Sequence, residues 1–246
     1  MNSVFACSCA NVDINNRYLI SDFIGVVEIE GLFDNEENKR FYTANLREIE
    51  TFKGTPPAQI KIGGTVKESY SSQCEVPVRK GEQWLIYIDD RSNTPFILGQ
   101  CDGPIRLLDE KGNRGHRYKT AKHYMEQLRF FREHAPDIHS KEIISTDRVK
   151  LFEFLKSYEG RSFEQSTAHY LIHFNTDLQV TQIKVLDGFS ETTDDQIINF
   201  LSKEAEWYAG YFTPNNKTTI ESDTQFIFTL YHNSKDKTLS HVYYER

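Results

Sequence analysis

The stretch RKGEQWLIYI at positions 79–88 says most about how this chain folds. Its first four residues favour a turn, and the run from Trp84 to Ile88 that follows is apolar throughout. A short apolar run that begins at a turn is typical of a strand buried on both faces. The stretch therefore predicts a sheet in the first half of the chain, with this strand in its interior.

Further short segments of strand character surround this stretch. Positions 23–30 alternate at their end, with Val27 and Ile29 on one face and glutamates on the other. Positions 41–49, 59–65 and 96–98 predict further strands, which are separated by turn signals. Several short strands at this spacing predict a small barrel or sandwich.

A helix is expected after these strands. Tyr118, Ala121, Met125 and Leu128 recur at helical spacing, and the pattern ends near position 134. The polar segment 136–145 then predicts a linker. We therefore expect a first domain over 7–135 and a second over 146–246.

The last hundred residues contain no cysteine and mix helix and strand patterns. Val149, Phe152 and Leu155 predict a short helix at the start of this region. The other elements are predicted as strands at 170–174, 180–185 and 226–230 and a helix at 194–205. The order helix, strand, strand, helix, strand predicts a small α+β domain.

Composition limits the class of protein. The chain has 246 residues, and its 38% hydrophobic content is enough for folded cores. Its formal net charge of −7 argues against nucleic acid or an anionic membrane as the main partner. No apolar run approaches the roughly 20 residues that a membrane-spanning helix needs. A soluble globular protein with folded cores fits these limits.

Four cysteines are present, at positions 7, 9, 74 and 101. Cys7 and Cys9 are too close in sequence to bond each other easily, because a disulfide needs roughly 4.4–6.8 Å between Cα atoms and a near-perpendicular torsion. Pairing with distant cysteines would pin the N-terminal segment onto the folded body. Four cysteines allow three connectivities, and structural zinc is the alternative, although zinc knuckles usually use pairs of C-x2–4-C.

The residues before Cys7 resemble a processing site. Val4-Phe5-Ala6 has the small-residue pattern that signal peptidase cleaves, although six residues are too few for a whole signal peptide. We expect a secreted, periplasmic or cell-surface protein with a truncated signal peptide, in keeping with the even number of cysteines. Acylation of Cys7 and a chance match are the alternatives.

The first part of the chain resembles the N-terminal domain of the tissue inhibitors of metalloproteinases, a netrin-like branch of the OB-fold barrels. The resemblance rests on CSCA at 7–10, the strand at 22–29, FKG at 52–54, SQC at 72–74, GEQWL at 81–85 and QCDG at 100–103. It implies an OB-type β-barrel over about 7–108, with disulfides Cys7–Cys74 and Cys9–Cys101. It also implies that a partner binds the ridge formed by Cys7, Ser8, Cys9, Ala10, Ser72 and Gln73.

The same resemblance implies a mechanism of inhibition. In that family the amino group and carbonyl of the first cysteine chelate the zinc of the protease, and the next side chain enters the substrate pocket. Cys7 and Ser8 hold those positions here. Inhibition of this kind requires Cys7 to be the free N-terminus, and otherwise the resemblance implies no metal ligand in the chain.

The second part resembles the C-terminal domain of TonB-type energy transducers. Positions 170–174, the return strand to Val185, the helix at 194–205, Trp207 and the strand at 226–230 follow that layout. The resemblance implies a domain that binds an extended peptide at a sheet edge. The proline-rich spacer of full transducers is absent, and Tyr208-Ala209-Gly210-Tyr211 replaces the usual pattern after the tryptophan.

Candidate catalytic residues have structural explanations. The chain has no G-x-S-x-G, H-E-x-x-H or P-loop motif. Asp89-Asp90 ends a predicted strand, and Asp194-Asp195 begins a predicted helix, where acids favour the helix dipole. Exposed strand histidines explain His169 and His173, with a metal pair as the alternative. The other histidines considered, near the predicted helix, are expected to be solvated: His116, His123, His134 and His139.

The sequence thus predicts a mainly β plus α+β protein with an N-terminal OB-type β-barrel, a flanking helix and a C-terminal α+β domain. We expect a non-enzymatic protein without a cofactor that acts by protein–protein interaction in the cell envelope, with metalloprotease inhibition as a narrower form. The partner would be a metalloprotease or an extended peptide. The alternative is a hydrolase or metal-dependent enzyme with a site between the two domains.

Overall fold

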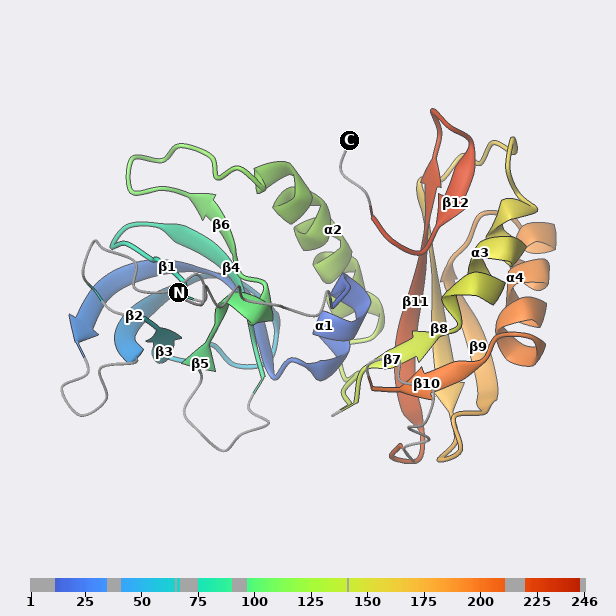
Figure 1. Cartoon of the computed structure of the whole chain (residues 1–246), viewed down its shortest axis with the longest axis horizontal. Helices are drawn as coiled ribbons and strands as arrows, with labels where there is room; N and C mark the ends of the chain where they lie inside the picture. Colours follow the sequence, from blue (N-terminus) through green and yellow to red (C-terminus); the bar gives the residue numbers. More distant parts are fainter. Residues whose placement is uncertain are drawn as a thin grey trace, which may run out of the picture. The chain divides into compact units, whose positions relative to one another are not determined.

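A computed structural model of the chain describes residues 12–34, 41–64, 66, 75–89, 97–140, 142–210 and 220–243. The chain divides into two compact units (Figure 1). The first is formed by the described residues of Met1–Val12 and Ser21–Glu133, and the second by Asp13–Ile20 together with those of His134–Arg246. The described residues form a β-rich α+β protein, and each unit is described by itself below.

The first unit is built on a six-stranded sheet in the order β5-β3-β2-β1-β4-β6. Within it, the β3–β5 pair is parallel and the other pairs are antiparallel. Its elements are β1 (Phe23–Asp34), β2 (Phe41–Lys53), β3 (Gln59–Gly63), β4 (Gln83–Ile88), β5 (Ile97–Leu98), the 3-10 helix η1 (Gln100–Asp102), β6 (Ile105–Leu108) and α2 (Tyr118–His134).

The interior of this sheet confirms the expectation from positions 79–88. Trp84 to Ile88 are all buried, so β4 has both faces covered. β1 keeps the predicted alternation, with Val27 and Ile29 buried and Glu30 exposed. Three register shifts interrupt the pairing of β1 with β2. Such irregularities bend a strand and increase its twist, which lets the sheet curve around its core.

No closed barrel is formed by the described residues. The hydrogen-bonded sheet ends at β5 on one side and at β6 on the other. β5 is only two residues long, and its pairing is with β3. The prediction of several short strands is confirmed, whereas the OB-type barrel stays a prediction, because the described strands do not close on themselves.

The turn before β4 is held by a buried carboxylate. Glu82 has no exposed surface, and its side chain accepts hydrogen bonds from the Trp84 indole (3.0 Å) and the backbone N–H of Arg79 (2.9 Å). Its other oxygen forms an ion pair with Arg106 of β6 at 3.0 Å. Gly81 takes a positive φ of 87°, which glycine adopts without steric cost. These contacts explain why the turn and the strand occur together in the sequence.

The helix α2 is connected to β2 by arginines. Arg129 donates two hydrogen bonds to Glu50, at 2.8 and 2.6 Å, and Arg132 donates to the carbonyl of Thr51 at 2.7 Å. The hydrogen bonds from Arg129 lower the pKa of the Glu50 carboxyl. Leu128 and Phe131 are fully buried. The predicted helix and its end at position 134 are confirmed.

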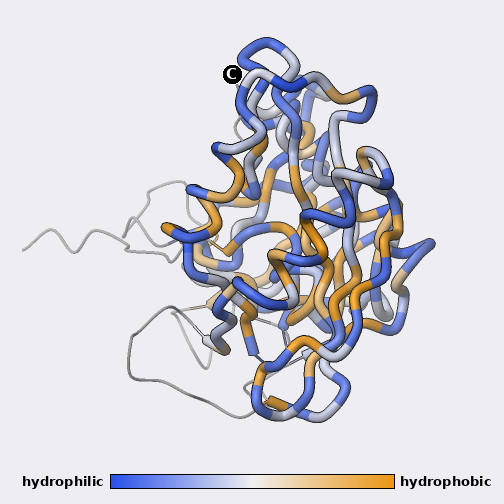
Figure 2. The backbone as a smooth tube through the Cα atoms, turned by 90° about the vertical axis from the view of Figure 1, so that its right-hand side faces the viewer, coloured by the Kyte–Doolittle hydropathy of each residue, from blue (hydrophilic) through white to orange (hydrophobic). Residues whose placement is uncertain are grey.

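The second unit contains a four-stranded antiparallel sheet in the order β12-β11-β8-β9. Figure 1 shows α3 and α4 together on one face of this sheet. Its elements are α1 (Ile14–Ile20), β7 (Ile144–Thr146), α3 (Arg148–Lys156), β8 (Thr167–Phe174), β9 (Val180–Asp187), α4 (Glu191–Lys203), β10 (Trp207–Ala209), β11 (Thr224–Asn233) and β12 (Thr238–Ser240). Figure 2 shows apolar and polar segments alternating along the tube of this unit, as elements with one buried side require.

An N-terminal helix completes the second unit. The sequence predicted that residues 13–20 belong to the first domain, because residues that are adjacent in sequence are normally assigned to the same domain. Instead, Asn16 of α1 bonds both the N–H and the carbonyl of Ile144, at 2.7 and 2.8 Å. Asn15 accepts a hydrogen bond from Thr229 of β11 at 2.9 Å. Leu19 is fully buried. The predicted linker also lies in this unit, where Ile143 and Ile144 are buried.

The helix α3 exists as predicted, but its buried side is different. Leu151 and Leu155 face the core, whereas Val149 and Phe152 are 67% and 66% exposed. Asp147 caps the helix by accepting from the backbone N–H groups of the next turn. The cap sets where the helix starts, and packing then selects which apolar residues point inward. Spacing alone predicted the helix but not its orientation.

Candidate functional site

The predicted ridge cannot be placed. Of the four cysteines only Cys101 is described; it lies in η1, is exposed, and no free cysteine is found among the described residues. The pairs Cys7–Cys74 and Cys9–Cys101 therefore stay a prediction. The remaining residues of the ridge and its pairing lie outside the described residues: Cys7, Ser8, Cys9, Ala10, Ser72, Gln73 and Cys74.

The outer edge of β9 is the first candidate site. β9 is eight residues long and, within the described residues, it pairs only with β8. Its other edge therefore presents backbone N–H and C=O groups that can pair with another chain. The opposite edge strand, β12, has only three residues. β9 is thus the longer of the two edge strands of this sheet, and offers more backbone groups for pairing with an added strand.

The side chains along β9 differ between its two faces. Ile183 and Val185 pair with Ile172 and Tyr170, and so lie on the face that carries the helices. Val185 is 37% exposed. Lys184 is exposed on the other face, opposite Leu171. A lysine and two register shifts in the β8–β9 pairing are features that natural edge strands use against unspecific pairing. A binding segment would have to match this pattern.

A buried hydrogen bond fixes α4 over the sheet. The Tyr170 hydroxyl donates to Asp194 at 2.6 Å, and the N–H of Phe189 donates to the same carboxylate at 3.1 Å. Burial, together with the bond to Asp194, raises the pKa of Tyr170 well above its ordinary value. Asp194 lies in the first turn of α4 as predicted, but it is 93% buried and so is a structural group. The helix itself starts earlier than predicted, with Ser190 as its cap.

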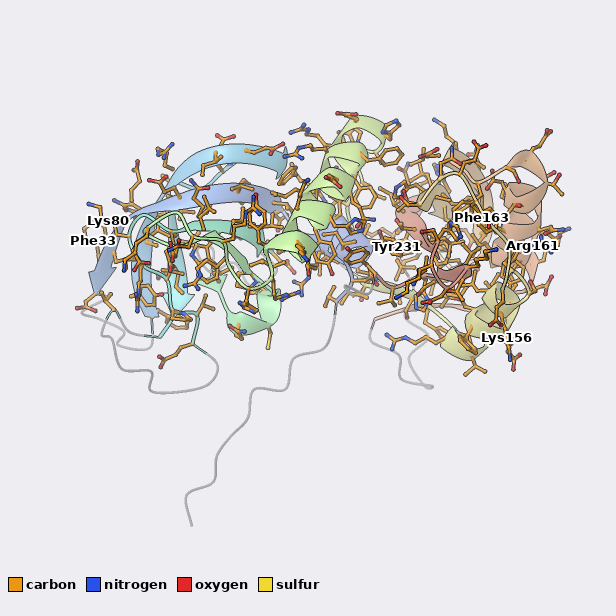
Figure 3. All side chains as sticks on the ribbon, turned by 90° about the horizontal axis from the view of Figure 1, so that it is seen from above. Phe33, Lys80, Lys156, Arg161, Phe163 and Tyr231 are labelled. Carbon is orange, nitrogen blue, oxygen red and sulfur yellow. The ribbon has the colours of Figure 1, made fainter. Side chains whose placement is uncertain are left out.

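A groove between α3 and α4 is the second candidate. Its volume is about 490 Å³, within the range of small-ligand sites. The groove is lined from the α3 side by Phe154, Tyr158 and Arg161, and from the α4 side by Asp195 and Glu204. Figure 3 shows Arg161 and Phe163 in the segment that follows α3. No local sequence pattern indicates this groove, because it forms only where two helices distant in sequence pack together.

The histidines differ from their predicted surroundings. His169 is buried, and its Nδ1 lies 3.0 Å from the Thr229 hydroxyl, so it is not an exposed strand residue. His173 lies on the same strand and is partly buried. Within the described residues, no three His, Cys, Asp or Glu side chains are grouped to hold a metal ion. His169 instead belongs to a polar chain that continues through Thr229 to Asn15.

The other predicted surface residues are four histidines and the acidic pair after β4. His116, His134 and His139 are exposed as predicted, whereas His123 is partly buried, and burial lowers its pKa. Asp89 directly follows β4, in agreement with the prediction, and Asp90 lies outside the described residues. Among the helices described, none is long and apolar enough to cross a membrane.

The comparisons with known proteins give no family. No family model matches the chain, and no curated protein matches it. The structure therefore defines the class only as a β-rich α+β protein of two units, with an eight-residue edge strand and an interhelical groove in the second.

Proposed function

We propose that this chain is a non-enzymatic, exported protein that acts by binding other proteins, and that its second unit binds an extended peptide along the edge of β9. The observation that carries the proposal is the length of this strand and its pairing on one side only, within the described residues. An added strand gains main-chain hydrogen bonds, while alternate side chains give specificity. The resemblance to a peptide-binding transducer domain supports the same mode.

The pattern along β9 indicates the chemistry of the peptide. Its side chains on the helix-bearing face would pack beside Val185 and Ile183, and those on the other face would lie beside Gln182 and Lys184. A peptide of alternating apolar and polar residues fits both faces.

The proposal can be tested with a capped peptide of alternating valine and threonine. We expect saturable changes in the amide NMR spectrum of the full chain, together with slower hydrogen exchange of β9 amides. Val185→Lys should weaken binding, because it places a charge on the apolar side of the edge. Val149→Lys is the matched control, since Val149 is also an exposed valine of this unit. Binding that maps elsewhere, or that ignores Val185→Lys, would contradict the proposal.

Metalloprotease inhibition is the narrower proposal for the first unit. It is supported by the strand order β5-β3-β2-β1-β4, with a parallel β3–β5 pair, which is compatible with the partly open barrel of OB-type folds. The test compares protein that begins at Cys7 with the form that begins at Met1. Only the shorter form should inhibit, because an upstream peptide turns the chelating amine into an amide. Equal inhibition by both forms would exclude amine chelation.

The predicted disulfides have a direct test. The intact, unreduced protein should be lighter than the reduced protein by four hydrogens, and peptide mapping should give Cys7–Cys74 and Cys9–Cys101. Four free thiols or a bound zinc ion would contradict the disulfide framework.

A further inference from the structure

The groove between α3 and α4 has a rigid aromatic floor. The rings of Phe154 and Phe200 are stacked, with centroids 4.1 Å apart and 6° between their planes. Tyr158 packs edge-on against Phe154 at 5.4 Å and donates its hydroxyl to Gln196 at 3.0 Å. Phe154 and Tyr158 line the groove, and the buried ring of Phe200 packs behind Phe154, so the floor exists before any ligand arrives. A preformed floor lowers the entropy that binding costs.

Opposite charges line the same groove without neutralising each other. The Arg161 guanidinium lies 4.8 Å from the centre of the Tyr158 ring, and it has no ion pair within the described residues. Asp195 likewise has no ion pair in the described part of the chain. Glu204, at the far end of α4, accepts a hydrogen bond of 3.4 Å from Asn199. The groove therefore offers a cation and two carboxylates at separate positions around an aromatic surface.

Other charged groups at the helices are already paired. Just beyond Glu204, Lys150 and Glu206 form an ion pair with each other, and the Tyr208 hydroxyl donates to Glu206 at 2.7 Å. This pair joins α3 to the segment between α4 and β10, outside the groove. Arg161 and Asp195 take part in no such ion pair within the described residues, so both charges are available to a ligand in the groove.

We infer that this groove binds a short apolar peptide with free ends, the carboxylate at Arg161, the ammonium at Asp195 and Glu204, and an apolar side chain on Phe154. A ligand with two opposite charges matches both the cation and the carboxylates, whereas a singly charged ligand would match only one of them. The two charges of the ligand must also lie apart from each other, because Arg161 and Asp195 are too far apart to form an ion pair. A dipeptide or tripeptide carries its charges at its two ends and is of a size suited to a site of about 490 Å³.

This site is independent of the β9 edge. The edge would recognise main-chain groups of an extended segment, whereas the groove would recognise the terminal charges of a small molecule. The two proposals therefore respond to different changes in the same peptide. Capping both ends should abolish binding in the groove and leave pairing at the edge unaffected.

The probe is the dipeptide Leu-Leu, titrated into the full chain and followed by amide NMR and calorimetry. We expect saturable shifts at residues of α3 and α4. Acetylation of the amine or amidation of the carboxylate should each weaken binding about tenfold, in line with the loss of one charged hydrogen bond. Equal binding of the doubly capped dipeptide, or no saturable shift with Leu-Leu, would overturn the inference.

Variants identify which group receives which end. Arg161→Gln should weaken Leu-Leu but not its amide, and Asp195→Asn should weaken Leu-Leu but not its acetylated form. Lys235→Gln and Asp177→Asn make the same charge changes at exposed turns of this unit and should leave affinity unchanged. If the control variants weaken binding as much, general electrostatics explain the result and the site is refuted. Folding of each variant is verified from the dispersion of its amide spectrum.

Discussion

The first unit holds its buried carboxylate against a cation, whereas the second holds its own between neutral donors. Glu82 lies in a turn directly before β4 and forms an ion pair with Arg106. Asp194 lies in α4 and accepts from Tyr170 and the backbone of Phe189. In the first unit the acid connects neighbouring strands, and in the second it connects a helix to a sheet. A buried acid in this protein thus marks a structural junction in both units.

The two units also differ in how the chain builds them. Within the described residues, the first takes Val12 and residues of Ser21–Glu133, whereas the second takes the whole segment Asp13–Ile20 in addition to the residues after position 133. Its helix α1 is hydrogen-bonded through two asparagine side chains to β7 and β11. Stability of the second unit should therefore depend on residues that precede most of the first. Trp84 and Trp207 report separately on the two units in single-tryptophan variants.

The largest expected effect is that of Leu19→Ala. Leu19 is fully buried, and deletion of such a side chain costs about 2–5 kcal/mol. The loss should appear in the urea unfolding of the second unit, followed by Trp207 in a Trp84→Phe background. Trp84 fluorescence in a Trp207→Phe background should report a smaller change. Selective destabilisation of the first unit would show that α1 does not belong to the second.

Glu82→Gln should destabilise the first unit by about 2 kcal/mol, because the uncharged amide no longer pairs with Arg106 in a buried turn. Glu110→Gln is the control, since the Arg79–Glu110 pair is exposed and should contribute less than about 1 kcal/mol. Urea unfolding followed by Trp84 measures both. Equal effects of the two variants would mean that burial of Glu82 has no energetic importance.

Tyr170→Phe should destabilise the second unit by about 1–2 kcal/mol. It removes one donor to Asp194 and leaves the buried carboxylate with the N–H of Phe189. Trp207 is the probe. An unchanged transition would show that the hydroxyl is not needed to hold α4, and the comparison between the two buried acids would fail.

The last expected effect is an opposite response of the units to alkaline pH. Burial lowers the pKa of Lys53 to about 8, so between pH 8 and 10.5 the unfolded chain binds more protons and the first unit should gain stability. The raised pKa of Tyr170 acts in the other direction: its contribution is complete below pH 10 and is lost as the pH rises further. Lys53→Met should remove the gain and Tyr170→Phe the additional loss, measured as unfolding midpoints against pH. Identical pH profiles of variant and parent would contradict these assignments.

Local patterns predicted most elements correctly. The apolar run before Ile88 indicated a buried strand, and the spacing of Ala121 and Leu128 indicated α2, because both patterns depend on residues close in sequence. The pattern around Phe152 indicated a helix but not its orientation, since the buried side of α3 depends on what packs against it. The short helix α1 was missed, because much of its stabilisation comes from residues more than a hundred positions away.

The candidate sites divide in the same way. The sequence by itself determined the strand β9, because its apolar residues recur at strand spacing. It also determined the turn at Glu82 and supplied the four cysteines on which the predicted disulfides depend. Only the tertiary structure decided that β9 is an edge, that residues 13–20 belong to the second unit, and that Arg161 and Asp195 line one groove. The physical reason is that periodicity records which side of an element is apolar. Which element covers that side depends on contacts between distant parts of the chain. The same contacts decide which charged side chains remain without an ion pair when helices pack.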